Sequence, residues 1–232
     1  MTTNDERSPI PGDFSGIVRI FPLPNLVLFP HVAQPLHIFE PRYCEMLEDA
    51  MADDQLIAMA LLEPGWQNDY EGRPAIAPVA CLGQVISHAQ VEGAKHNIIL
   101  RGVCRVEIER ELPPVRSFRQ AKVNLIEDQF TEDDATRNDL RRRLVEAFRR
   151  YVTTASMLHA EFDEILEKQV PLDVITDVVA YSLQTDPAFK QQILNETNVE
   201  QRATTLIDVL EMTTTHFERQ KDSTFPPDFS AN

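Results

Sequence analysis

The sequence predicts an α+β fold in which a strand-rich first half is followed by a helical second half. Between residues 17 and about 127, short apolar segments alternate with polar residues or are separated by Pro and Gly, as is typical of strands. From about residue 132 the apolar residues recur every three to four positions, which is the period of an amphipathic helix. A chain of 232 residues corresponds to one large domain or two small ones.

Four segments of the first half are predicted as strands from their own patterns. Residues 104–109 and 121–125 alternate apolar with polar side chains, as half-buried strands do. Residues 85–91 and 95–101 flank Gly93, and we expect them to form a hairpin that turns at this glycine.

Three further signals place a bulge, a helix and a buried strand in the same half. Gly102 interrupts a strand pattern, which predicts a bulge or a barrel corner. Pro41 suits the first turn of a helix, because its missing N–H would have no partner there. The apolar run 56–62 is interpreted as a strand, since Pro and Gly follow it.

The second half is predicted to hold five helices, around residues 140–151, 162–166, 172–183, 186–193 and 199–217. Asp186 followed by Pro187 predicts an N-cap and a first-turn proline for the fourth helix. Thr197 with Glu200 three positions later predicts a capping box at the start of the fifth. The polar ends of the chain, residues 1–16 and 222–232, are predicted to be disordered.

Composition narrows the class of protein. The formal net charge of −15 disfavours nucleic acid as a partner, because phosphate backbones are repelled at long range. The three cysteines, Cys44, Cys81 and Cys104, are widely spaced, so neither a disulfide framework nor a zinc ribbon is expected. The start of the chain lacks the features of a signal peptide, and no apolar run is long enough to cross a bilayer. We therefore expect a cytoplasmic protein without a membrane contact.

Two stretches near the start carry a resemblance to a known family. Residues 20–30 read Ile-Phe-Pro-Leu-Pro-Asn-Leu-Val-Leu-Phe-Pro, and residues 34–43 read Gln-Pro-Leu-His-Ile-Phe-Glu-Pro-Arg-Tyr. Together they resemble the opening of the Lon protease N-terminal (substrate-binding) domain, and weaker similarity extends over residues 17–218. The resemblance implies a PUA-like β-barrel with one inserted helix over 17–127, followed by a C-terminal helical bundle over 128–221.

The resemblance also implies a function. In Lon proteases this region helps to recognise unfolded or tagged proteins, and ATPase and peptidase domains follow it. No Gly-x-x-x-x-Gly-Lys-Ser/Thr phosphate loop occurs in this sequence, so we expect a stand-alone recognition module that is not an enzyme. Its expected partners are unfolded or tagged protein segments and a protease or chaperone for which it acts as an adaptor in proteolysis or quality control. PUA domains also bind RNA, so an RNA-binding alternative stays open, with Arg141–Arg143 and Arg149–Arg150 as its basic cluster.

Two segments are the candidate peptide-binding surfaces. The loop from 63 to 78 is long and carries Trp66 and Tyr70, and long loops and exposed aromatic side chains are common at binding surfaces. The turn Phe29-Pro30-His31 also combines apolar side chains with a rigid proline. For Trp66 an alternative stays open, in which the indole plugs one end of the barrel.

The remaining candidates are interpreted as structural. Glu40, Arg42 and Tyr43 are expected to form a hydrogen-bonded junction where a strand meets a helix. His37 with Glu40, and His159 with Glu161 and Asp163, lack the ligand spacing of a zinc site. No local signature of a cysteine enzyme surrounds any of the three cysteines, which are expected to be buried. The sequence therefore predicts no catalytic residue, no metal ligand and no cofactor.

Overall fold

The computed structural model describes residues 10–70, 72–93, 95–155 and 170–223 of the chain. Its strands are β1 (Ile17–Leu23), β2 (Ala33–Ile38), β3 (Leu56–Leu61), β4 (Val79–Val91), β5 (Lys95–Glu111) and β6 (Arg119–Ile126). Its helices are α1 (Pro41–Met51), the short 3-10 helix η1 (Trp66–Asp69), α2 (Asp134–Thr154), α4 (Leu172–Ser182), α5 (Pro187–Asn195) and α6 (Val199–Ser223). The predicted α+β class is confirmed, whereas the helix predicted around 162–166 and most of both predicted disordered ends lie outside the described residues.

The chain divides into two compact units. The first contains Met1–Glu127 together with Ala180–Thr197, and the second contains Asp128–Val179 together with Asn198–Asn232. The first unit therefore holds all six strands, and it also holds α5, which the sequence had grouped with the helical half. The side-chain amide of Gln191 on α5 donates a 2.9 Å hydrogen bond to the carbonyl oxygen of Val79 at the start of β4, which explains this grouping.

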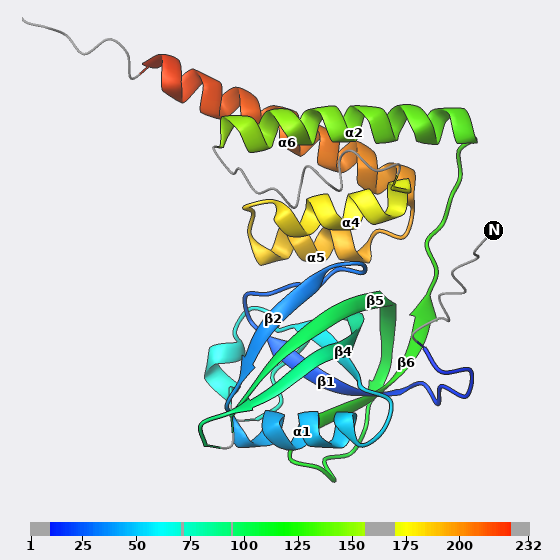
Figure 1. Cartoon of the computed structure of the whole chain (residues 1–232), viewed down its shortest axis with the longest axis vertical. Coiled ribbons are helices and arrows are strands. Elements are labelled where there is room, and N and C mark those ends of the chain that lie inside the picture. Colours follow the sequence, from blue (N-terminus) through cyan, green and yellow to red (C-terminus); the bar gives the residue numbers. More distant parts are fainter. Residues whose placement is uncertain (1–9, 71, 94, 156–169, 224–232) are drawn as a thin grey trace, which may run out of the picture. The chain divides into compact units, whose positions relative to one another are not determined.

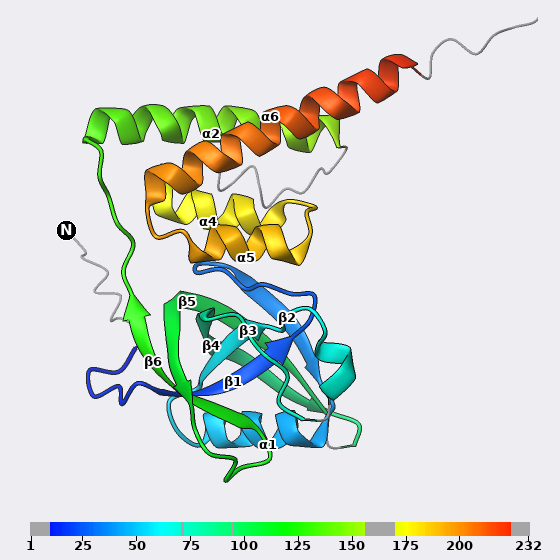
Figure 2. The same cartoon turned by 180° about the vertical axis from the view of Figure 1, so that it is seen from behind.

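The strands of the first unit pair in a closed ring (Figures 1 and 2). The pairing order is β5-β4-β3-β1-β6, and β6 pairs again with β5, so that every strand of the ring pairs with two others of the ring. Within the ring β1 and β3 are parallel, and the other pairs are antiparallel. β2 lies outside the ring and pairs with β5. Figure 1 shows α1 lying along one side of the strands.

Side chains at alternate positions of the five ring strands form the core of this unit. The cluster consists of Val18, Ile20, Leu56, Ala58, Ala60, Ala80, Leu82, Val106, Ala121 and Val123. The alternation is the period-two pattern that predicted β5 and β6 as strands. On β3 the intervening residues Ile57 and Met59 are buried as well, which explains why this strand is apolar throughout.

Gly102 lies at a bulge and at a close backbone approach. The pairing of β4 with β5 shifts by one residue between Leu82 and Gly83, opposite Gly102, as the sequence predicted. A Cβ atom on Gly102 would lie 2.0 Å from the carbonyl oxygen of Phe29. The Gly102 N–H donates to the carbonyl oxygen of Val32, and the His31 N–H donates to that of Gly102. The absence of a side chain therefore lets the segment before β2 bind directly to β5.

In the second unit, α2 and α6 lie side by side in both views (Figures 1 and 2). The buried stripe of α2 contains Leu140, Leu144, Phe148 and Tyr151, as its period predicted. α6 carries Arg202, which is fully buried and forms a bidentate ion pair with Asp128 at 2.6 and 2.8 Å. No helix in the described part of the chain is both long and apolar enough to cross a membrane.

Of the two predicted helix N-caps, the one for α5 is confirmed and the one for α6 is not. Asp186 accepts a 2.8 Å hydrogen bond from the Phe189 N–H, and Pro187 begins α5, as expected. The capping box of Thr197 and Glu200 is wrong, because α6 begins one residue later and its cap is Asn198, which accepts from the Gln201 N–H at 2.8 Å. The Glu200 carboxylate instead accepts from the backbone of Thr131 and Glu132.

Candidate functional site

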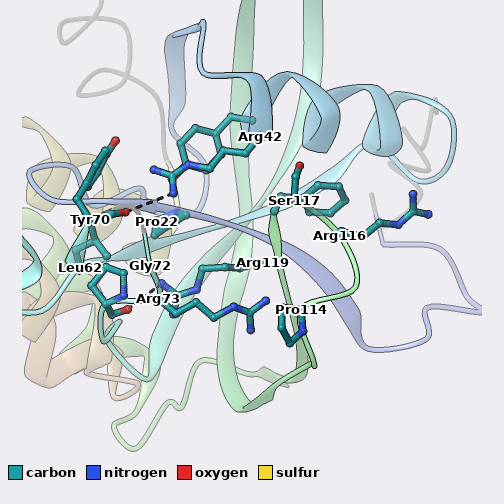
Figure 3. Close-up of a pocket in the computed structure, with 13 residues that line it drawn as sticks. Pro22, Arg42, Leu62, Tyr70, Gly72, Arg73, Pro114, Arg116, Ser117 and Arg119 are labelled. Atoms are coloured by element: carbon teal, nitrogen blue, oxygen red, sulfur yellow. Dashed lines mark hydrogen bonds between the residues drawn. The ribbon is translucent and has the colours of Figure 1, made fainter.

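A cavity of about 250 Å³ opens in the first unit between the loop that follows β3 and the loop that joins β5 to β6. Figure 3 shows Leu62, Tyr70 and Gly72 on one side, Pro114, Arg116 and Ser117 on the other, and Arg73 and Arg119 between them. The full lining is Pro22, Arg42, Tyr43, Leu62, Tyr70, Gly72, Arg73, Pro74, Pro114, Arg116, Ser117, Phe118 and Arg119. Among the described residues, four arginines and no acidic residue line this cavity, although the net charge of the protein is −15.

Two of these arginines are fixed by carboxylates that stand behind the lining. The guanidinium of Arg119 donates to both oxygens of Glu111, at 2.8 and 2.5 Å, and a third N–H donates to the carbonyl oxygen of Pro74. The guanidinium of Arg42 donates from Nε and Nη2 to one oxygen of Glu40, at 3.1 and 2.9 Å. These contacts hold both groups in place at the wall of the cavity.

The other two arginines are less engaged. Arg73 donates from Nη1 to the carbonyl oxygen of Leu112 at 3.0 Å and lies 3.7 Å from Glu111. Arg116 lies 3.4 Å from Asp49, and half of its side chain is exposed. Asp49 also accepts a 2.6 Å hydrogen bond from Arg19, which has Asp53 and Asp54 as further partners. Guanidinium groups therefore face the cavity, and the carboxylates that pair with them lie behind its lining.

Tyr43 supplies a hydroxyl group to the same wall. Its ring packs on Phe21 with 4.7 Å between ring centroids, and the residue is only 5% exposed. Among the described residues the hydroxyl has no hydrogen-bond partner. Burial raises the pKa of Tyr43 to about 12, although the positive charge of Arg42 opposes this rise. The group is therefore a neutral O–H donor at physiological pH.

Tyr70 connects the loop after β3 to the start of α1. Its hydroxyl donates to Glu40 at 2.7 Å, and its carbonyl oxygen accepts from Arg42 at 3.4 Å. The guanidinium of Arg42 also lies over the rings of Tyr70 and Tyr43, at 5.0 and 4.7 Å. The predicted structural junction of Glu40, Arg42 and Tyr43 thus belongs to the same cluster as Tyr70, which the sequence had placed in a separate binding loop.

Trp66 lies beside this cluster and not in the core. It begins η1, is half-buried, and meets the ring of Tyr70 edge-on with 5.6 Å between centroids. The core residues of the ring do not include it, so the alternative of a plug inside the strands finds no support. We therefore keep Trp66 as a candidate contact residue next to the cavity.

The second predicted surface, Phe29-Pro30-His31, is wrong for its two apolar residues. Phe29 is 0% exposed and Pro30 is buried, because the turn is held against Gly102 of β5. His31 is exposed and has a φ of 66°, so it marks the tip of the turn. A surface that offers no apolar contact is a poor candidate for peptide binding.

The sequence missed three arginines and one aromatic residue of the cavity: Arg73, Arg116, Phe118 and Arg119. A signal did exist, because residues 113–119 read Pro-Pro-Val-Arg-Ser-Phe-Arg and combine rigid, aromatic and basic residues between two strands. The link to Arg73 is not visible in the sequence, since it depends on the pairing of distant strands.

The other candidate chemistry is absent from the described residues or is engaged elsewhere. Within these residues no three His, Cys, Asp or Glu side chains gather to hold a metal ion, and the group around His159 lies outside them. Cys44 and Cys81 are buried, and burial raises the pKa of Cys104 to about 11, so the thiol is not a ready nucleophile. In the basic cluster of α2, Arg142 is paired with Asp139 at 2.6 Å.

Comparisons with known proteins agree with this architecture. The family model described as "ATP-dependent protease La (LON) substrate-binding domain" matches residues 17–212. The Lon protease of Rhizobium meliloti is 26% identical over 192 residues, which cover 83% of this chain and 23% of that protein. The Lon protease of Anaeromyxobacter dehalogenans is 22% identical over 198 residues, covering 85% of this chain and 23% of that protein.

Two solved structures share the fold. The N-terminal domain of the Mycobacterium avium complex Lon protease has a TM-score of 0.68 at 13% identity and covers 84% of this chain and 98% of that one. The Lon N-terminal domain protein of Xanthomonas campestris has a TM-score of 0.61 at 18% identity, covering 83% and 97%. The chain spans about a quarter of the length of the curated relatives. Since the family model covers most of its residues, the chain belongs to the LON substrate-binding domain family.

Proposed function

We propose that this chain is a non-enzymatic module that binds flexible segments of other proteins, and that it does so at the arginine-lined cavity. The name of the family supports a role in substrate binding. The observation that carries the proposal is the cavity itself, which is lined by guanidinium groups, two tyrosines and several prolines. Aromatic and arginine side chains dominate the energetics of protein recognition sites.

The rim of the cavity adds exposed apolar surface. Val115 is 86% exposed at the tip of the loop between β5 and β6, and its N–H donates to the carbonyl oxygen of Pro113. Together with the flanking prolines this turn presents a rigid apolar contact, which loses little entropy on binding. We further propose that the closed ring of strands is the PUA-like barrel of the family and serves as a rigid scaffold for both loops.

Delivery of bound segments to a protease or a chaperone is the biological role that we propose for this binding. Unfolded or tagged proteins would then be its clients, and the module would act as an adaptor in proteolysis or protein quality control. This step rests on the Lon relatives, in which the matched region is one part of a much longer protein.

The test is a binding measurement with an unfolded client. Reduced, carboxymethylated α-lactalbumin should bind, and the native form should bind much more weakly. Hydrogen exchange should slow on client binding in residues 66–70 and 112–118. Val115→Ser should weaken binding about threefold to tenfold, whereas Met212→Ser, at another exposed apolar residue (73% exposed), should not. Equal binding of both client forms, or protection elsewhere only, would refute the proposal.

A further inference from the structure

The chemistry of the cavity selects for more than a generic flexible segment. We infer that it binds the free C-terminal carboxylate of a protein chain whose last side chain is apolar. This inference rests on the proposed function and names the part of the client that is recognised. Three features of the cavity carry it: unused donors, apolar residues beside them and limited size.

The donors point to a single anionic group. Among the described residues the Nε and Nη2 groups of Arg73 have no partner, and neither has the hydroxyl of Tyr43. Guanidinium groups bind carboxylates through paired N–H donors, and a neutral hydroxyl can add a further hydrogen bond. Glu40 and Glu111 already engage Arg42 and Arg119, so the groups that remain for a ligand belong mainly to Arg73, Arg116 and Tyr43.

Apolar residues lie beside these donors. Among the described residues the apolar part of the lining consists of Pro22, Leu62, Pro74, Pro114 and Phe118, of which Pro74 and Pro114 are the more exposed. An inorganic anion would leave these apolar side chains without a counterpart. A ligand that carries a carboxylate next to an apolar group would contact both kinds of surface.

A carboxylate and an apolar group that lie next to each other in the ligand indicate the C-terminus of a protein chain. In a protein, a carboxylate and an apolar side chain share one α-carbon only at the last residue, because the carboxylates of Asp and Glu lie on the side chain itself. The cavity, at about 250 Å³, is also smaller than the roughly 300–1,000 Å³ of typical small-molecule sites. A terminal residue is therefore a better match than an extended ligand.

The experiment compares two forms of one peptide. A short fluorescein-labelled peptide, rich in glycine and serine and ending in phenylalanine, is prepared with a free C-terminal carboxylate and as the C-terminal amide. Fluorescence anisotropy with the full chain measures both affinities. The free acid should bind at least about tenfold more tightly, which is the range for hydrogen bonds to a charged group. Equal affinities, or no binding of either form, would overturn the inference.

Two variants locate the effect. Arg73→Gln and Tyr43→Phe should each reduce the advantage of the free acid by about threefold to tenfold, because each weakens binding of the charged acid more than binding of the neutral amide. Tyr43→Phe removes only the hydroxyl and keeps the buried ring, so its folding should be intact. Arg101→Gln is the matched control, since this exposed arginine lies on β5 and outside the lining. An advantage that survives both variants would place the carboxylate elsewhere and overturn the assignment.

Competition separates the sources of negative charge. Acetate should displace the free acid at high concentration, and inorganic phosphate should be no better at equal ionic strength. If phosphate displaces the peptide and acetate does not, the cavity is a phosphate site and the inference is wrong. Binding of unfolded α-lactalbumin is measured in parallel, because the proposed function stands if this client binds while the two peptide forms do not differ.

Discussion

The hydroxyl of Tyr70 donates a 2.7 Å hydrogen bond to the carboxylate of Glu40, 30 positions earlier in the chain. Glu40 is the N-cap residue of α1, so this bond ties the loop after β3 to the start of the helix. Arg42 completes the link, because it binds the carboxylate of Glu40 and the backbone of Tyr70. One side of the cavity is therefore held by the side chains that also form the strand-to-helix junction.

Glu40→Ala should lower the free energy of unfolding by about 1–3 kcal/mol, since Arg42 and Tyr70 lose an acceptor while they stay partly buried. Amide hydrogen exchange in residues 66–70 should become faster, because the loop loses its attachment. Urea unfolding and exchange mass spectrometry measure the two effects. Glu109→Ala, which removes an exposed carboxylate paired with Arg110, should change neither. Unchanged exchange in Glu40→Ala would show that the loop is held by other contacts.

The pKa of Tyr43 predicts a loss of stability at high pH. Burial raises this pKa from 10.0 to about 12, so above pH 10 the unfolded chain releases the proton while the folded chain keeps it. The associated stability is complete below pH 10 and is lost as the pH rises to 12, by about 2–3 kcal/mol in total. Tyr43→Phe should remove this part of the decline. If the wild type and the variant lose stability in parallel between pH 10 and 12, the buried phenol is not its source.

Gly102→Ala should destabilise the protein by at least about 3 kcal/mol or prevent folding, because the added Cβ would lie 2.0 Å from the carbonyl oxygen of Phe29. Hydrogen bonds hold the backbone of Gly102 to the segment 31–32, so a movement that makes room for the Cβ atom would break them. Gly12→Ala is the control, since a Cβ there meets nothing within 4 Å. Chemical denaturation of both variants checks the prediction, and similar stabilities would contradict the close approach at the bulge.

Asn198→Ala should cost about 1 kcal/mol, because α6 loses the acceptor for the Gln201 N–H and the contact of the Asn198 amide with Thr131. Thr197→Ala should have a much smaller effect, although the sequence favoured Thr197 as the cap. Thermal melts of the two variants at equal concentration decide between the two positions. A larger loss for Thr197→Ala would restore the capping box.

Trp66→Ala should lower stability by only about 1–2 kcal/mol, since the indole is half-buried and meets the ring of Tyr70 edge-on. A buried plug would cost about 3–5 kcal/mol. Binding of unfolded α-lactalbumin should weaken in the same variant, whereas Phe39→Ala, at an exposed ring on the same unit, should bind normally. A stable variant that binds its client normally would remove Trp66 from the site.

Local constraints explain which elements could be predicted from the sequence. Pro41 fixes a first helical turn, Gly93 allows the positive φ of a hairpin turn, and Gly102 allows a bulge. Each of these residues restricts or frees the backbone by its own covalent structure, so the prediction needs no partner. The period-two pattern of β5 and β6 is local as well, because successive side chains of a strand point to opposite faces, so the apolar positions identify the buried face.

The remaining features depend on contacts between distant segments. Thr197 and Asn198 are both good caps, and Asn198, the one that caps α6, also donates a hydrogen bond to the distant Thr131. Phe29 lies in a proline-rich turn that looks exposed in the sequence, yet it is buried because Gly102 lets it approach β5. The arginines of the cavity look like ordinary solvated charges until the ring of strands brings their loops together.

The closed ring also sets a condition on how the chain is made. β1 pairs with β6 through Ile17 and Lys122, which are about a hundred positions apart, so the first strand cannot gain this neighbour until the last one has been synthesised. At a typical rate of about 5–20 residues per second, the wait is about 5–20 s. During that time the edge of β1 that later binds β6 is open to other chains, and a nascent-chain chaperone has its best opportunity to act.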